Sequence, residues 1–294
     1  CLLDLPRIPS TVSAKDTGLD LLGSSHELDN VTRDAVASMR SRIEDPAEFL
    51  EEIRVRIRKA PDALPISNAY RMEVFRLRRE FLNESRARGE LMPKFPPHLD
   101  RQPIAFFEEL VREHPSRETK LQLALAWVDE MLLFPALEIK APSSVQSVDI
   151  LSDILEEPGN EYYVPALFAR GLNHLHRPAR LVWPETNKTP PDAAVQDIAK
   201  CVAIGRKLKA GSPRLQSILA MTLGDAYVKA GRLSVARSWW QIAQNLSHED
   251  DIQQAVRRRY GWGDEEILDS LEEELDRART ELDHPMTDLA MMWN

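Results

Sequence analysis

Residues 217–250 read SILAMTLGDAYVKAGRLSVARSWWQIAQNLSHED, and this stretch decides the expected fold. Its apolar residues recur every three to four positions on either side of a central glycine, which predicts two amphipathic helices joined by a tight turn. Gly224 and Ala236 are small enough to let the two helices cross closely, while Tyr227 and Trp240 would fill the neighbouring grooves. The stretch therefore predicts an antiparallel helix pair.

This pattern resembles the tetratricopeptide repeat (TPR), whose period is about 34 residues. The positions that match the family's core are Leu223, Gly224, Tyr227, Gly231, Leu233, Ala236, Trp240 and Ala243. Ala220 departs from the pattern where a large aromatic is usual, and His248 departs where a proline commonly closes the repeat. The resemblance implies helix pairs stacked into a solenoid with a concave surface lined by the first helices.

The rest of the chain repeats the helical pattern more weakly. Residues 166–174 resemble another first helix, with Gly171 at the small position. One helix pair cannot bury its own apolar face, so several stacked units are expected. No stretch alternates cleanly as a half-buried strand, and the sequence predicts an all-α protein. One helix is expected near 28–39, a second begins at Pro46, and a third ends at about Gly89. Further helices are expected over 104–114, 121–134, 145–156, 162–176 and 192–209.

Prolines and glycines divide the chain into four expected regions. Residues 1–25 read as an extended tether, 26–97 as an N-terminal helical region, 98–262 as TPR-like repeats, and 263–294 as a C-terminal capping helix and tail. Proline-rich loops are expected at 135–142 and 177–191. The capping helix carries one apolar stripe: Ile267, Leu271, Leu275, Ala278 and Leu282. The apolar tail from Met286 either folds back onto the core or docks on a partner.

The first residue, Cys1, makes the chain resemble a mature bacterial lipoprotein, whose N-terminal cysteine carries covalent lipid. That resemblance implies a membrane-anchored protein of the cell envelope, and Leu2 after the cysteine favours the outer membrane. The alternative is an ordinary cysteine. Cys201 lies in an apolar helical setting and is expected to be a buried small hydrophobe. Beyond the lipid, the sequence predicts no cofactor.

Composition and motifs exclude several classes of function. The net charge is −9 and the sequence pI about 5.4, the wrong sign for binding nucleic acid through the overall field. The apolar run 131–137 is far shorter than the roughly 18 residues of a membrane-spanning helix. No Gly-x-Ser-x-Gly elbow or glycine-rich phosphate loop occurs, and His174 and His176 would point to different helix faces. We therefore expect no catalytic site and no metal site.

The charges are unevenly distributed. Residues 264–283 are strongly acidic, and residues 51–100 carry a small excess of positive charge. The basic set is Arg54, Arg56, Arg58, Arg71, Arg76, Arg78, Arg79, Arg86 and Arg88. These segments are either ordinary solvated helix faces or docking surfaces, the basic one for acidic protein or lipid and the acidic one for a basic partner.

The leading hypothesis is a non-catalytic, lipid-anchored adaptor that binds protein, as a scaffold or an accessory subunit of an envelope complex, an electron-transfer complex being one candidate. The residues expected to bind protein are Arg170, Asn173, Trp183, Asp225 and Lys229. Trp183 reads either as an anchor of its loop on the core or as an interface hot spot. The alternative function is solute binding, as in the TPR-like component of periplasmic substrate-capture transport systems, and it predicts a deep apolar cavity.

Overall fold

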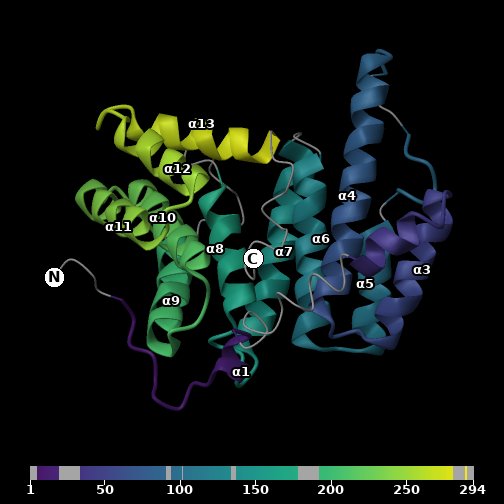
Figure 1. Cartoon of the computed structure of the whole chain (residues 1–294), viewed down its shortest axis with the longest axis horizontal. Coiled ribbons are helices and arrows are strands. Elements are labelled where there is room, and N and C mark those ends of the chain that lie inside the picture. The colour runs from purple at the N-terminus through teal and green to yellow at the C-terminus, as the bar shows by residue number, and fades with distance from the viewer. Residues whose placement is uncertain are drawn as a thin grey trace. The chain divides into compact units, whose positions relative to one another are not determined.

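The computed structural model describes residues 5–19, 34–90, 94–100, 102–133, 137–177, 192–280 and 289 (Figure 1). Every regular element in these residues is a helix, which confirms the all-α prediction. The chain forms two compact units, which we describe separately. The N-terminal unit comprises residues 25–150 and 284–290, and the C-terminal unit comprises 1–24, 151–283 and 291–294.

The N-terminal unit is a set of packed helices preceded by helical residues 34–40. Asp45 caps the first long helix as its sequence predicts, because its carboxylate accepts a hydrogen bond from the amide of Ala47, and Pro46 occupies the first turn. Helix α3 packs on α4, α4 on α6, and α5 on α6. The bounds are α3 (Pro46–Lys59), α4 (Leu64–Ala87), α5 (Gln102–Glu113) and α6 (Arg117–Leu133).

The core of this unit is aromatic and aliphatic. Tyr70 of α4 meets Phe106 and Phe107 of α5 edge to face, at ring-centroid distances of 5.3 and 5.9 Å. Burial raises the pKa of Tyr70 to about 12. The aliphatic residues of this core include Leu50, Ile53, Ile57, Val74 and Leu110.

Two arginines of the expected basic surface lie inside this unit instead. The guanidinium of Arg71 is fully buried and donates hydrogen bonds to Gln122, Asp129 and Asn68. Arg78 is buried against Glu130. The interpretation of both as surface residues was wrong, because carboxylates of α6 hold them in the interior.

One tail residue, Leu289, is described and belongs to the N-terminal unit. It is buried, and its backbone amide donates a hydrogen bond of 3.0 Å to the side-chain oxygen of Asn68. At this residue the tail folds back onto the chain, which is one of the two expected outcomes.

The C-terminal unit is a succession of helices in which chain neighbours pack together. Helix α8 packs on α9, α9 on α10, α10 on α11, and α11 on α12. The bounds are α8 (Val164–Leu175), α9 (Ala193–Leu208), α10 (Pro213–Lys229), α11 (Leu233–Leu246), α12 (Asp250–Tyr260) and α13 (Ile267–Thr280). This order of contacts is typical of a helical-repeat array.

Two glycines set how closely these helices approach. A Cβ added to Gly171 of α8 would lie 2.7 Å from the side chain of Ile198 on α9. A Cβ added to Gly224 of α10 would lie 2.5 Å from the indole of Trp240 on α11. Gly231, in the turn, has the positive φ of 72° that glycine adopts readily. The close crossing predicted at Gly224 and the turn predicted at Gly231 are thus observed.

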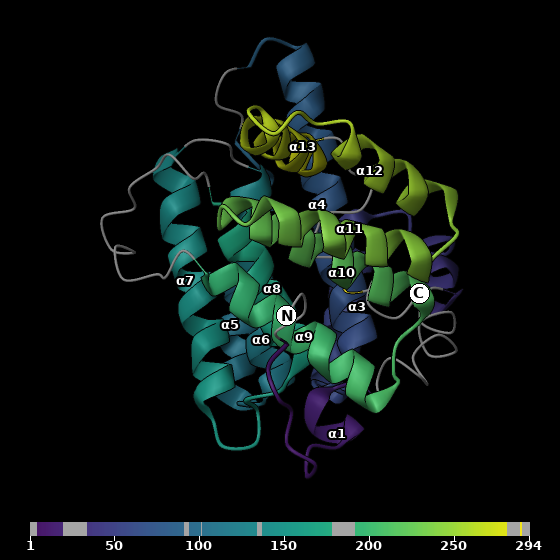
Figure 2. The same cartoon turned by 90° about the vertical axis from the view of Figure 1, so that its left-hand side faces the viewer.

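Helix α13 does not continue the alternation of pairs. It packs against α10, and Figures 1 and 2 together show it running across the direction of α10 and α11. Ile267, Leu271 and Leu275 of the expected stripe are buried. The side chain of Ala278 and all of Leu282 lie outside the described residues.

Two expectations about irregular segments were wrong. The expected loop at 135–142 is partly helical, because α7 (Leu137–Glu156) contains Pro142, and residues such as Glu138, Lys140 and Ala141 favour helix around it. The expected tether contains a short helix, α1 (Ala14–Thr17), which the Ser13–Asp16 capping box starts. The expected loop at 177–191 lies almost wholly outside the described residues.

The substitution Gly224→Ala tests the crossing of α10 and α11. The added methyl group overlaps the Trp240 indole, so we expect a loss of unfolding free energy of about 1–3 kcal/mol. Gly205→Ala is the matched control, because Gly205 also lies within a helix and a Cβ built there meets its nearest atom at 3.7 Å, an ordinary contact. Urea denaturation measures both variants, and equal stability of the two would contradict the close crossing.

Candidate functional site

A buried carboxylate joins three helices of the C-terminal unit. Asp225 of α10 is 3% exposed. Its Oδ1 accepts hydrogen bonds from Nε1 of Trp240 at 2.9 Å and from Nε of Arg259 at 2.8 Å, and its Oδ2 accepts one from Nη2 of Arg259 at 2.7 Å. Since Trp240 lies on α11 and Arg259 on α12, this one side chain connects α10 to both helices.

Arg259 also forms an ion pair with a residue of α13. Its Nη1 lies 3.8 Å from Oε1 of Glu274, whose carboxylate pairs with Arg258 at 3.1 Å and with Arg277 of its own helix. Arg258 and Arg277 are nearly half exposed, whereas Arg259 is buried. Glu274 therefore collects three guanidinium groups at the junction of α12 and α13.

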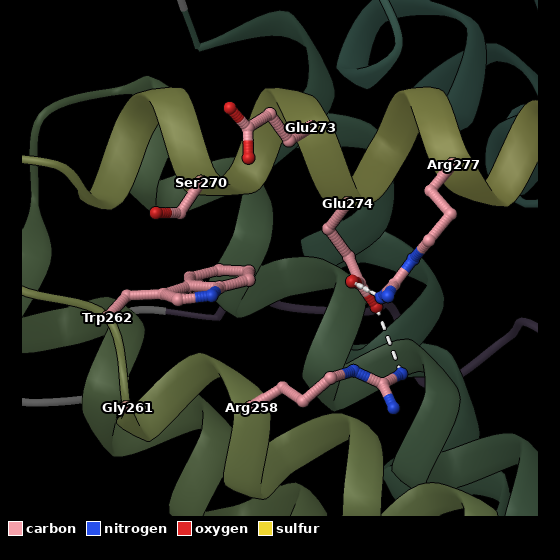
Figure 3. Close-up of a pocket in the computed structure, with 7 residues that line it drawn as sticks. All are labelled: Arg258, Gly261, Trp262, Ser270, Glu273, Glu274 and Arg277. Carbon is pink, nitrogen blue, oxygen red and sulfur yellow. Dashed lines mark hydrogen bonds and ion pairs between the residues drawn. The ribbon is translucent and has the colours of Figure 1, made fainter.

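An open pocket of about 390 Å³ lies at this junction (Figure 3). Glu274 and Arg277 point from α13 toward Arg258, and the indole of Trp262 lies beneath Ser270. The indole packs edge to face on Trp240 at 5.9 Å. The lining residues are Arg258, Gly261, Trp262, Ser270, Glu273, Glu274 and Arg277.

The pocket combines an aromatic surface with exposed guanidinium groups. Trp and Arg are the residue types most enriched at the energetic centres of protein interfaces. Trp262 is already held by Trp240 and by the guanidinium of Arg259, 5.6 Å from its ring centre. A side chain so held loses little conformational entropy when a partner binds.

Four of the expected protein-binding residues are described, and each has contacts within the chain. Arg170 binds Asp197 of α9 through two hydrogen bonds of 2.8 Å, and Asn173 is buried. Asp225 is buried in the network above. Lys229 reaches Glu272 of α13 at 3.4 Å and donates a hydrogen bond to the carbonyl of Arg177. These polar groups have partners within the chain.

Two other expected residues, Cys1 and Trp183, lie outside the described residues. The covalent lipid on Cys1 and the interface role of Trp183 stay predictions.

Two groups of types that often carry chemistry, Cys201 and His174, are largely shielded from solvent. Cys201 is fully buried, which raises the pKa of its thiol well above the usual range. Burial lowers the pKa of His174 to about 3, and the charges of Arg177 and Arg170 contribute to the same shift. Both groups are therefore uncharged near neutral pH, the thiolate and the imidazolium being disfavoured.

The described residues contain no cluster of three His, Cys, Asp or Glu side chains that could hold a metal ion. None of the described helices has the length and apolar character needed to cross a bilayer.

The sequence reasoning missed Arg258, Arg259, Trp262 and Glu274 as site residues. Three consecutive arginines at 257–259, followed at once by Trp262 and then by an acidic helix, were the available signal. The helix that carries the arginines, α12, was not predicted either. Comparison with protein-family models, curated proteins and solved structures finds no match to this chain.

The substitution Asp225→Asn tests whether the three-helix connection is energetically important. It leaves the buried Arg259 guanidinium without its countercharge, so we expect a loss of about 3–5 kcal/mol in unfolding free energy. Adding Arg259→Met should restore part of this loss, and the double-mutant cycle gives the coupling.

Glu249→Gln serves as the control for this experiment, because the Arg214–Glu249 pair is largely exposed and should contribute at most about 1 kcal/mol. The connection would be refuted if Asp225→Asn cost no more than Glu249→Gln.

The lowered pKa of His174 predicts that the free energy of unfolding depends on pH. Its folded-state pKa of about 3 lies below the unfolded value of 6.5, so the folded protein binds fewer protons between these pH values. The contribution of neutral His174 to the free energy of unfolding is complete above pH 6.5. It declines as the pH falls toward 3, by up to about 1.4 kcal/mol per pH unit.

Urea denaturation of the wild type and His174→Gln at about pH 7.5, 6 and 5 measures this effect. The wild type should lose more stability than the variant as the pH falls. Parallel losses would show that His174 is not the group responsible.

Proposed function

We propose that this chain is a non-catalytic, TPR-like adaptor that binds another protein through the pocket between α12 and α13. The observation that carries this proposal is the pocket itself, where a pre-positioned tryptophan lies beside two half-exposed arginines. An array in which the helices from α8 to α12 pack on their chain neighbours supports it, because such arrays present extended surfaces to partners.

The character of the pocket favours a protein over an apolar solute. Four of its lining side chains are charged, and the pocket is open to solvent. An apolar solute is typically enclosed by mostly hydrophobic side chains. The segment of a partner that enters this pocket should therefore carry a carboxylate beside an apolar or aromatic group.

Site-specific photo-crosslinking in the native host tests the proposal. With p-benzoylphenylalanine at Trp262, we expect one reproducible crosslinked protein, identified by mass spectrometry. The same label at Gln241, on the exposed side of α11, is the control and should not capture that protein.

The identified protein is then purified and its affinity measured. Because truncation of an aromatic hot spot costs about 2 kcal/mol or more, Trp262→Ala should weaken binding more than about tenfold, whereas Gln241→Ala should not. No protein specific to the Trp262 label, or an unchanged affinity, would refute the function.

A further inference from the structure

Three cationic side chains of α10 and α12 meet the carboxylates of α13. Lys229 of α10 lies 3.4 Å from Glu272, and Arg258 and Arg259 of α12 lie 3.1 and 3.8 Å from Glu274. Both carboxylates belong to the acidic segment 264–283, and all three cations belong to the helices beneath it. The face of α10 and α12 that binds α13 is thus positively charged.

Helix α13 is amphipathic, like the helices by which many proteins bind to a groove on a partner. Ile267, Leu271 and Leu275 recur every four residues and are buried, while Asp269 and Glu273 are exposed. An amphipathic helix that places an i, i+4, i+8 apolar stripe on another surface is a common mode of recognition between proteins. Here the chain supplies both the surface and the helix.

The contacts of α13 are weaker than those between α10 and α11. Helix α13 contacts α10 over fewer residues than α11 does. The pocket of about 390 Å³ leaves the junction between α12 and α13 incompletely packed. By contrast, α10 and α11 pack without room for one methyl group at Gly224.

The surface beneath α13 is held in place by other contacts. Asp225 fixes the guanidinium of Arg259 through two hydrogen bonds that do not involve α13. Trp240 and Arg259 support Trp262 in the same way. Arg259 and Trp262 would therefore keep these supports if α13 moved away.

We propose that α13 is an internal occupant of a docking surface on α10 and α12, and that the protein partner displaces it with an acidic amphipathic helix. The partner helix carries an apolar stripe and carboxylates that replace Glu272 and Glu274. This inference rests on the proposed function, because it names the kind of partner and explains how the chain limits access to the surface. Of the pocket that carries that function, Arg258 and Trp262 stay on the docking surface when α13 is displaced, whereas Arg277 leaves with α13.

A labelled peptide of residues 264–280, added to the full chain, tests this inference. In the wild type the tethered α13 competes at an effective concentration in the millimolar range, so the peptide should bind weakly. The variant Glu272→Lys with Glu274→Lys weakens the internal helix, and the peptide should bind it more tightly by about tenfold or more.

Charge exchange provides the specificity control. Lys229→Glu should repel the wild-type peptide and prefer a peptide carrying Glu272→Lys. Circular dichroism and cooperative unfolding establish that each chain variant is folded. The proposal is overturned if no peptide binds the folded release variant, or if the charge of residue 272 in the peptide has no effect.

Hydrogen exchange of the unmodified chain gives a second test, which does not depend on whether a variant folds. The amides of α13 should exchange at least about tenfold faster than those of α10 and α11, because local opening of α13 needs no global unfolding. Equal protection would make α13 an integral part of the core and would overturn the inference.

The two proposals can fail separately. A partner crosslinked at Trp262 with no peptide binding would leave the adaptor function standing and refute displacement of α13. Peptide binding without any crosslinked protein would support the internal occupant and refute the adaptor function.

Discussion

The carboxylate of Asp225 lies where almost no solvent reaches it, and an unpaired charge at such a place would cost several kcal/mol. Its countercharge, Arg259, belongs to α12, and its third donor, Trp240, belongs to α11. The buried charge on α10 is therefore compensated by side chains of both later helices. Gly224, the preceding residue, lets α11 approach closely enough for the indole to reach the carboxylate.

This arrangement separates what local sequence could predict from what it could not. The small residues Gly171 and Gly224 mark the helix crossings because their environment is determined by residues one helix away in a regular pattern. Asp225 was expected to face a partner, because it flanks the core positions of the repeat. Its countercharge lies 34 residues further along the chain, and no periodicity within α10 indicates that pairing.

Buried arginines were misjudged for the same reason. Arg71 and Arg78 follow the helical spacing of a polar face, and only their pairing with Asp129 and Glu130 of α6 brings them into the interior. Helix α12 was missed because only Ile252 and Val256 supply its apolar period, and Arg259 occupies the next buried position. Where a charged residue occupies a core position, the hydrophobic pattern no longer indicates a helix. In this chain that residue is Arg259, and the candidate pocket lies beside it.

Apolar packing and charge together determine how α13 is held, because Ile267, Leu271 and Leu275 are buried while Glu272 and Glu274 pair with cations of α10 and α12. The apolar part of this contact stabilises without needing a particular partner atom. A seam of carboxylates and guanidinium groups is directional, and any helix that presents carboxylates at equivalent positions can satisfy it. Because Asp225 already balances the charge of Arg259 from below, exchanging one acidic helix for another leaves no buried charge unpaired. The network that connects α10, α11 and α12 therefore also provides the cationic surface from which we propose that α13 is displaced.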